Sequence, residues 1–270
     1  MDFLSRDDMP LDETLWDRID NEVVETSKKH LKGRRFLPIF HSGSGSNVAY
    51  VDGHERTENF KDGIVVDENR KVISLPQLYS DFWLYWRDIE HAKTQGYSVD
   101  LSATTYAAKQ LARREDELIF YGNNDLGLDG LLTVKGSQSL KRGDWTTGEN
   151  SFQDIAKAVT MLETNGFSGT HSLIVSPDLY LELERIQPGT GLLEVDRIKN
   201  VLSGKLIKST ALKPKTAIVV CNEQPYMDLQ VGVDISTAYV ELADNMNHHF
   251  RILETIALRI KEPQAIVILK

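Results

Sequence analysis

An extended arm is predicted by residues 48–75, VAYVDGHERTENFKDGIVVDENRKVISL. Two short alternating segments, 48–51 and 63–66, are set among charged residues, and a Gly/Ser tract at 41–47 leads into them. This pattern is typical of two extended strands with few side chains for a core. Because a two-stranded ribbon alone is marginally stable in water, we expect this arm to lie on a neighbouring copy of the chain.

Two long helices are predicted on either side of the arm. The first spans 12–32, with Asp12 as N-cap and Gly33 after its last turn, and the second spans 102–121 and ends at Gly122. Apolar residues recur at helical spacing on one face of each, at Leu15, Ile19 and Val23 and at Ala107, Ala108, Leu111, Leu118 and Ile119. The charged run 113–117 is expected to be mostly solvated or at a subunit contact.

From residue 151 onward, helices and strands alternate. Ser151 is expected to cap a helix, 171–176 to form a buried strand, and Pro177 to open another helix. The remaining strands are expected at 216–221, 227–231, 236–241, 250–260 and 265–269. These elements predict an α+β fold.

Composition limits the function. The 270 residues carry a formal charge of −9, which argues against nucleic-acid binding as the main role, because phosphate contacts need a Lys/Arg excess. The single cysteine, Cys221, fits a reducing compartment, and its apolar surroundings at 217–221 favour a buried small side chain. Neither a signal peptide nor a membrane span is predicted, so we expect a cytoplasmic protein without a membrane partner.

Motifs for catalysis or metal binding are missing from the sequence. It contains no Gly-x-Ser-x-Gly, Gly-x-Gly-x-x-Gly, phosphate loop, His-Glu-x-x-His or Glu-x-x-His. His248 and His249 are adjacent, so on a strand they point to opposite faces. The aromatic run 79–86 suits either a stacking platform for a flavin or base, or a packing cluster. We therefore expect no catalytic residues, no metal site and no enzyme activity.

Several segments, in order, resemble the encapsulin family, whose shell subunits share the fold of tailed-phage major capsid proteins. They are MDFL at 1–4, GRRF at 33–36, EDELIFYG at 115–122, SLIVSPDLY at 172–180, LSGK at 202–205, VGVDISTAY at 231–239 and PQAI at 263–266. The resemblance implies a self-assembling subunit of an icosahedral homo-oligomer. Residues 1–47, 76–130 and 226–270 would form a peripheral domain, 48–75 an extension loop, and 131–225 an axial domain.

The resemblance also implies two sites. A pore loop would lie at a symmetry axis and comprise Gln187, Pro188, Gly189, Thr190 and Gly191; it carries no side-chain charge, so size, backbone groups and the nearby Glu184, Arg185 and Glu194 would set selectivity. An inner groove would hold the C-terminal targeting peptide of a cargo protein, lined by Leu31, Arg34, Phe36 and Ile39, with Asp234 and Ile235 opposite.

The segment 78–90, LYSDFWLYWRDIE, is especially similar to members that build larger shells and enclose an iron-mineralising, ferritin-like cargo. Iron chemistry would then belong to the cargo, and the shell would need no cofactor. Some family members bind flavin through a tryptophan near this segment. Leu84 stands at that position here, between Trp83 and Trp86, so the resemblance does not imply that this chain binds flavin.

Two alternatives remain. A phage capsid protein would have the same fold with a genome as cargo, but an acidic chain is an awkward lining for packed DNA. A peptidase or bacteriocin, an activity historically ascribed to this family, has no supporting motif in the sequence.

Overall fold

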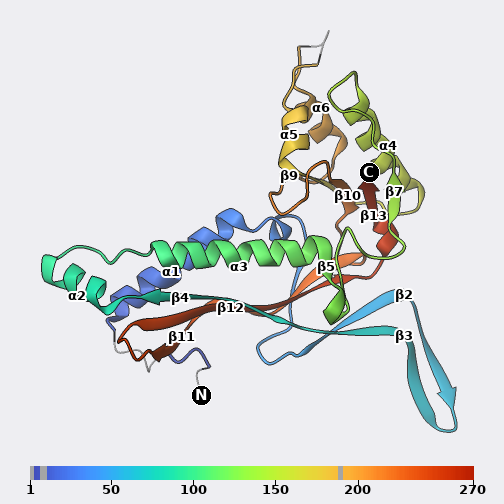
Figure 1. The fold of residues 1–270 in the computed structure, drawn as a ribbon. Helices are drawn as coiled ribbons and strands as arrows, with labels where there is room; N and C mark the ends of the chain where they lie inside the picture. The colour runs from blue at the N-terminus through green and yellow to red at the C-terminus, as the bar shows by residue number, and fades with distance from the viewer. Residues whose placement is uncertain (1–2, 7–10, 188–190) are drawn as a thin grey trace.

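The computed structural model describes residues 3–6, 11–187 and 191–270. An elongated body carries a second lobe at one end, and a two-stranded arm projects away from both (Figure 1). The helices are α1 (Glu13–His30), α2 (Trp86–Gln95), α3 (Ser102–Tyr121), α4 (Asn150–Thr164), α5 (Pro177–Leu183) and α6 (Glu194–Val201), with 3-10 turns η2 (Gly33–Arg35), η3 (Asn124–Leu126) and η4 (Pro263–Ala265).

The strands of the body and arm are β1 (Ile39–His41), β2 (Val48–Lys61), β3 (Ile64–Ser74), β4 (Gln77–Leu84), β5 (Gly122–Asn123), β6 (Leu128–Asp129), β11 (Met227–Leu242) and β12 (His248–Ile260). Those of the second lobe are β7 (Gln138–Leu140), β8 (His171–Val175), β9 (Leu206–Lys208), β10 (Ala217–Cys221) and β13 (Ile266–Leu269).

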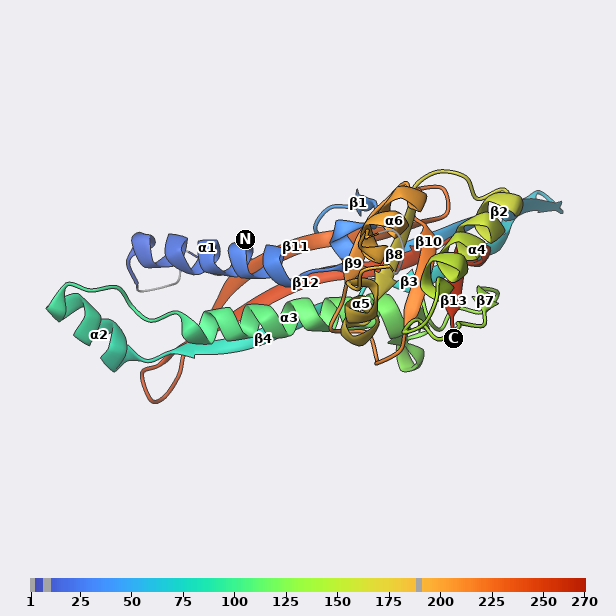
Figure 2. The same cartoon turned by 90° about the horizontal axis from the view of Figure 1, so that it is seen from above.

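The body is a four-stranded sheet in the order β1-β11-β12-β4, with α1 and α3 lying side by side along it (Figure 2). The predicted start of α1 and the predicted bounds of α3 are confirmed: Asp12 accepts a hydrogen bond from the Thr14 amide at 3.0 Å, and α3 ends where Gly122 takes a positive φ of 66°. The predicted end of the first helix is two residues too late, because α1 ends at His30 with Leu31 as its C-cap. Trp16 joins α1 to the sheet by packing against Phe250 of β12, which also stacks on Phe82 of the neighbouring strand β4.

One long strand, β11, stands where the sequence predicts two. It pairs with β12 along its whole length, but the register shifts between Val231 and Val233, between Val233 and Ser236, and between Tyr239 and Glu241. Such bulges add residues without ending the strand. Residues 232–235, which lie between the two predicted strands, are therefore the bulged part of a continuous strand.

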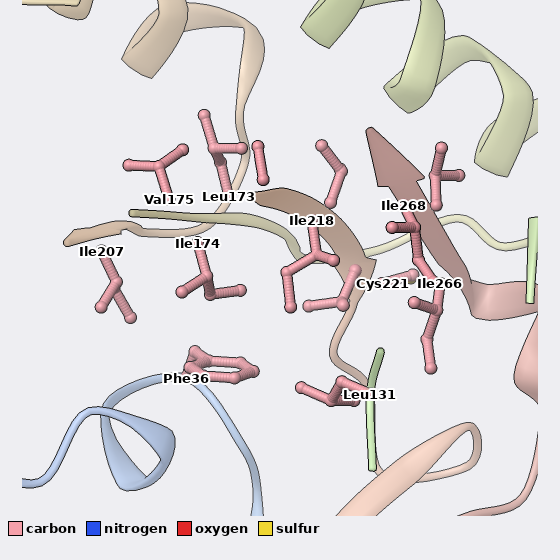
Figure 3. Close-up of a cluster of buried hydrophobic side chains, with 14 of the residues drawn as sticks. Phe36, Leu131, Leu173, Ile174, Val175, Ile207, Ile218, Cys221, Ile266 and Ile268 are labelled. Atoms are coloured by element: carbon pink, nitrogen blue, oxygen red, sulfur yellow. The ribbon is translucent and has the colours of Figure 1, made fainter. Parts of the chain in front are cut away.

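The second lobe is a five-stranded sheet in the order β7-β13-β10-β8-β9, covered by α4, α5 and α6. Its core is aliphatic and includes Leu173, Ile174, Ile218 and Cys221 (Figure 3). The predicted burial of Cys221 is confirmed, and burial raises the pKa of its thiol to about 11.

Two expectations about this lobe need correction. Strand β13 pairs with β10 and β7, so 266–269 belong to the second lobe and not with the rest of 226–270 in the body. Helix α4 begins at Asn150 with Glu149 as its N-cap, and Ser151 caps nothing. The Ser151 hydroxyl is fully buried and donates instead to the Glu194 carboxylate.

The predicted arm is the antiparallel pair β2–β3, turned at Asp62 and Gly63, which both have positive φ. Its base is held by Ala49 and Ile73, which are buried against the body. Beyond the base, large apolar side chains are open to solvent on both strands, including Phe60, Ile64, Val65 and Val66. No helix in the described ranges is both long enough and apolar enough to cross a bilayer.

Candidate functional site

A pocket of about 330 Å³ lies where the end of α1 and the turn η2 face the bulged part of β11. Its lining residues come from two segments about 200 positions apart in sequence: Val24, Ser27, Lys28, Leu31, Arg34 and Arg35 on one side, and Asp234 and Ile235 on the other. Four of the six predicted groove residues, Leu31, Arg34, Asp234 and Ile235, thus meet in one pocket.

The α1 side of the pocket is fixed to α3 through the backbone. The Asp116 carboxylate accepts hydrogen bonds from the amides of Lys32, at 2.9 and 3.1 Å, and Gly33, at 2.9 Å. Burial raises the pKa of Asp116 to about 7, although these two amides oppose the shift. Gly33 must lack a side chain because a Cβ there would collide with Ile119 of α3. The sharp turn after α1 is therefore held in one position.

The β11 side of the pocket is shaped by a bulge. Val233 pairs with Thr255, and Ser236 pairs with Leu253, so the strand carries one extra residue in the interval that holds Asp234 and Ile235. A bulge bends the strand and redirects its side chains. This explains how both residues leave the sheet and reach the end of α1.

Arg34 joins the two sides in a buried ion network. Its guanidinium lies 2.9 Å from Glu115, 2.5 Å from Glu254 and 2.5 Å from Asp234. Glu115 and Glu254 are fully buried, and the Arg34 side chain is only 14% exposed. Burial disfavours the charge on Arg34, but the two buried carboxylates outweigh it and raise the pKa of the guanidinium. Arg34 therefore stays charged, and its guanidinium is held in one position at the base of the pocket.

The network contains more acid than base. Three carboxylates surround one guanidinium, and Oε1 of Glu254 has no hydrogen-bond partner among the described residues. Burial and the nearby Glu115 raise the pKa of Glu254 well above its usual range. By contrast, Arg34 overcomes burial at Asp234 and lowers the pKa of that carboxyl. The exposed Asp234 is the ionised member at the pocket rim.

The expectation that 113–117 is mostly solvated is wrong for Glu115 and Asp116, which are 0% and 3% exposed. Both turn inward from α3, Glu115 toward Arg34 and Asp116 toward the turn after α1. The sequence did contain an indication that Glu115 is buried, because it lies four residues after Leu111 and four before Ile119 on the apolar face of the helix. A carboxylate at that register needs a buried cation, which Arg34 provides.

Phe36 and Ile39 do not line the pocket. After η2 the chain turns into the second lobe, and the Phe36 ring packs beneath its sheet with Ile174 and Leu131 (Figure 3). Phe36 is 5% exposed, so the proposed anchoring role is corrected to a core position. Ile39 is exposed on β1, where it pairs in parallel with Leu229 of β11.

In the predicted pore loop, residues 188–190 lie outside the described part of the chain. Its described ends are tied together, since the Gln187 amide donates to the Leu192 carbonyl at 2.9 Å. Below them, Arg185 pairs with the buried Glu194 at 2.7 Å and donates to the Gly148 carbonyl at 2.5 Å. The loop is thus attached to a rigid base, and its selectivity stays a prediction.

Strand alternation divides the aromatic run of β4. Phe82 points into the body and stacks on Phe250 at 5.1 Å between ring centroids. Trp83 points to the other face, where it stacks on His249 at 4.6 Å and stays 44% exposed. The run therefore supplies both core packing and an open aromatic surface.

Comparison with known proteins gives consistent matches. A family model described as "Encapsulating protein for peroxidase" matches residues 1–257. The type 1 encapsulin shell protein EncA of Myxococcus xanthus is 37% identical over 100% of this chain and 96% of its own length. A diheme-cytochrome-encapsulin shell fusion protein of Kuenenia stuttgartiensis is 36% identical over 94% of this chain and 72% of its own length.

Solved structures agree on the fold. A virus-like particle from Pyrococcus furiosus superposes with a TM-score of 0.78 at 22% identity, covering 94% of this chain and 99% of that one. The capsid of Myoviridae phage XM1 superposes with a TM-score of 0.67 at 14% identity, covering 87% and 90%. The predicted α+β fold of tailed-phage capsid proteins is confirmed.

Proposed function

Because this chain belongs to the encapsulin family of shell proteins, we propose that its copies assemble into a closed icosahedral shell that encloses a cargo enzyme. The β2–β3 arm is the observation that carries the proposal. Phe60 and Ile64 are 72% and 63% exposed on a ribbon that has almost no core of its own. Burying one such side chain against a neighbour contributes about 1.5–3 kcal/mol, so an arm with several of them favours association strongly.

Assembly is tested by negative-stain electron microscopy and gel filtration of the purified chain. Closed particles are expected, and a small oligomer without shells would refute assembly. The arm is tested by Phe60→Asp, which places a charge in the expected contact and should abolish closed particles. Phe60→Leu is the matched control, because it keeps an exposed apolar side chain at the same position and should retain closed particles.

The pocket between α1 and β11 is proposed to hold the C-terminal targeting peptide of the cargo. Leu31, Val24 and Ile235 provide an apolar surface, and the fixed Arg34–Asp234 pair provides polar groups that set the register of an extended peptide. A rigid pocket suits this role, because little ordering of the shell is needed on binding. The relative from Kuenenia stuttgartiensis is a fusion of a diheme cytochrome with an encapsulin shell protein. A docked peptide would bring cargo and shell together without such a fusion.

The cargo is proposed to be a ferritin-like, iron-oxidising protein, and the compartment to be a cytoplasmic iron store. The resemblance of 78–90 to iron-mineralising members supports this assignment. Under this proposal, oxidation belongs to the cargo, and the shell contributes enclosure, pores and docking without a cofactor.

Cargo docking is tested by purifying shells from the native host and identifying the enclosed proteins by mass spectrometry. Ile235→Asp should release the cargo while closed particles remain. The control Tyr106→Asp changes an exposed apolar residue on α3 outside the pocket and should retain cargo. Equal loss from both variants would refute the pocket assignment. Packed nucleic acid instead of protein would favour the phage-capsid alternative, whose fold is the same.

A further inference from the structure

A strongly basic surface lies at the carboxyl end of α1, beyond the pocket. Residues 28–35 read KKHLKGRR and contain no carboxylate, in a chain whose net charge is −9. Arg34 is committed to the buried network, but its neighbours face outward. Lysines from other elements join them, and we call this set the basic surface: Lys29, Lys32, Arg35, Lys109, Lys205 and Lys208.

These cations come from separate elements and act on one another. Lys205, which follows α6, donates from Nζ to the Arg35 carbonyl at 2.6 Å. The pKa of Lys32 is lowered, first by burial and then by the charge of Arg35; the buried Asp116 opposes this shift, and Lys208 of β9 adds a smaller lowering. The pKa of His30 is lowered, first by burial and then by Lys109 of α3 and by Lys32 and Lys29.

No carboxylate within the described residues lies at ion-pair distance from the side chains of the basic surface; at its border, Lys28 pairs with Glu25 at 3.4 Å. Part of the charge is explained by α1 itself, because Lys32 and Arg35 each donate to the Lys29 carbonyl at 3.0 Å near the negative end of the helix. That explanation does not cover Lys109, Lys205 or Lys208, which belong to other elements. Unbalanced cations repel, and a multivalent anion removes that repulsion.

We propose that the basic surface binds chains of inorganic phosphate. Ammonium groups bind phosphate oxygens as point charges and need no fixed geometry, which suits a surface built largely from lysine. Recognition of nucleic-acid bases usually adds open aromatic rings for stacking. Beside this surface, Lys208 Nζ lies 4.8 Å from the centroid of the Tyr180 ring, and the exposed Tyr106 lies one helical turn before Lys109, so cations outnumber the open rings. This proposal is tested separately from cargo docking: Arg35 borders both sites, but Lys29, Lys205 and Lys208 do not line the pocket.

The test is equilibrium dialysis of the full-length assembled protein against inorganic tripolyphosphate in 50 and 200 mM NaCl, with bound phosphorus measured by mass spectrometry. Binding is expected in 50 mM NaCl and should weaken at the higher salt. The variant Lys29→Gln/Lys205→Gln/Lys208→Gln should bind about tenfold more weakly.

The matched control is Lys93→Gln/Lys141→Gln/Lys157→Gln, which removes the same charge from exposed lysines elsewhere and should bind within about twofold of wild type. A second variant, with arginine at 29, 205 and 208, keeps the charge and should keep binding. Equal weakening by the two glutamine variants, or no phosphate bound by wild type, would overturn the proposal. Stronger competition by a polyglutamate peptide of matched charge would also overturn it and assign the surface to an acidic protein.

Discussion

Replacing Arg34 by methionine tests whether the buried ion network holds α1 to the body. The substitution keeps much of the side-chain volume but leaves Glu115 and Glu254 buried without their cation. Breaking a buried pair by removing one partner costs about 3–5 kcal/mol. For a chain of this length, 1 kcal/mol lowers the Tm by about 2–4 °C, so we expect a loss of roughly 10 °C at pH 8.

The loss should depend on pH. The pKa of Glu254 is raised in the folded protein, so the stability that this group contributes is complete at low pH and is lost as the pH rises. Wild type limits that loss because Arg34 compensates the ionised form, whereas Arg34→Met does not. The difference in Tm between the two proteins should therefore be small at pH 5 and large at pH 8.

Thermal unfolding followed by intrinsic fluorescence from pH 5 to 8 measures the loss of Tm at pH 8 and its dependence on pH. Adding Glu115→Gln and Glu254→Gln to Arg34→Met should restore most of the lost Tm at pH 8, because two neutral amides replace two unpaired charges. A loss at pH 8 below about 2 °C, or one that is equal at pH 5 and pH 8, would show that the network does not stabilise the fold as argued.

Three further predictions concern the same region and the core. Gly33→Ala should cost about 1–3 kcal/mol because its Cβ collides with Ile119, and Ile119→Val should recover part of that loss in urea unfolding; an additive double variant would contradict the contact. Because burial raises the pKa of Asp116 to about 7, the wild-type Tm should fall more between pH 6 and 8 than that of Asp116→Asn, and parallel curves would contradict the shift. The Cys221 thiol, buried with a pKa raised to about 11, should resist a thiol reagent in the native protein and react in guanidinium; rapid native reaction would contradict its burial.

Local patterns predicted the elements of this chain well. The bounds of α3 and the Asp12 cap of α1 followed from helical periodicity and from residues that favour helix ends. The arm followed from alternation without a core. These features depend on neighbours in sequence, which a single chain displays directly.

The site depended on distant neighbours and was predicted only in part. Arg34 and Asp234 are 200 residues apart, and only the resemblance to a family placed them together. Phe36 was assigned to the pocket by the same resemblance, yet the turn after α1 places it in the core of the second lobe. Glu115 and Asp116 were expected to be solvated because charge suggests exposure, whereas both are buried against partners from other elements: the Arg34 guanidinium for Glu115, and the amides of Lys32 and Gly33 for Asp116. The bulge in β11 is likewise hard to predict from sequence, because it is an extra residue in β11 relative to its partner strand β12 and is defined only once the two strands are paired.

The proposed assembly and docking surfaces are separate parts of one chain, and the structure indicates how they are kept apart. The pocket is made by the end of α1 and the bulge of β11, while the arm begins only after β1. Strand β1 pairs with β11 at 229–231, just before the bulge, and the Ser42 amide donates to the Val231 carbonyl at 2.9 Å. The segment that leads into the arm is therefore fixed to the sheet before it reaches the glycines at 43 and 45, which have positive φ and open space around them. The base of the arm is held as well, because Ala49 and Ile73 are buried against the body, so changes of angle are confined to the exposed part of the arm beyond them and the pocket keeps its shape. For this reason a shell of this chain should bind its cargo equally in every position that the arm allows.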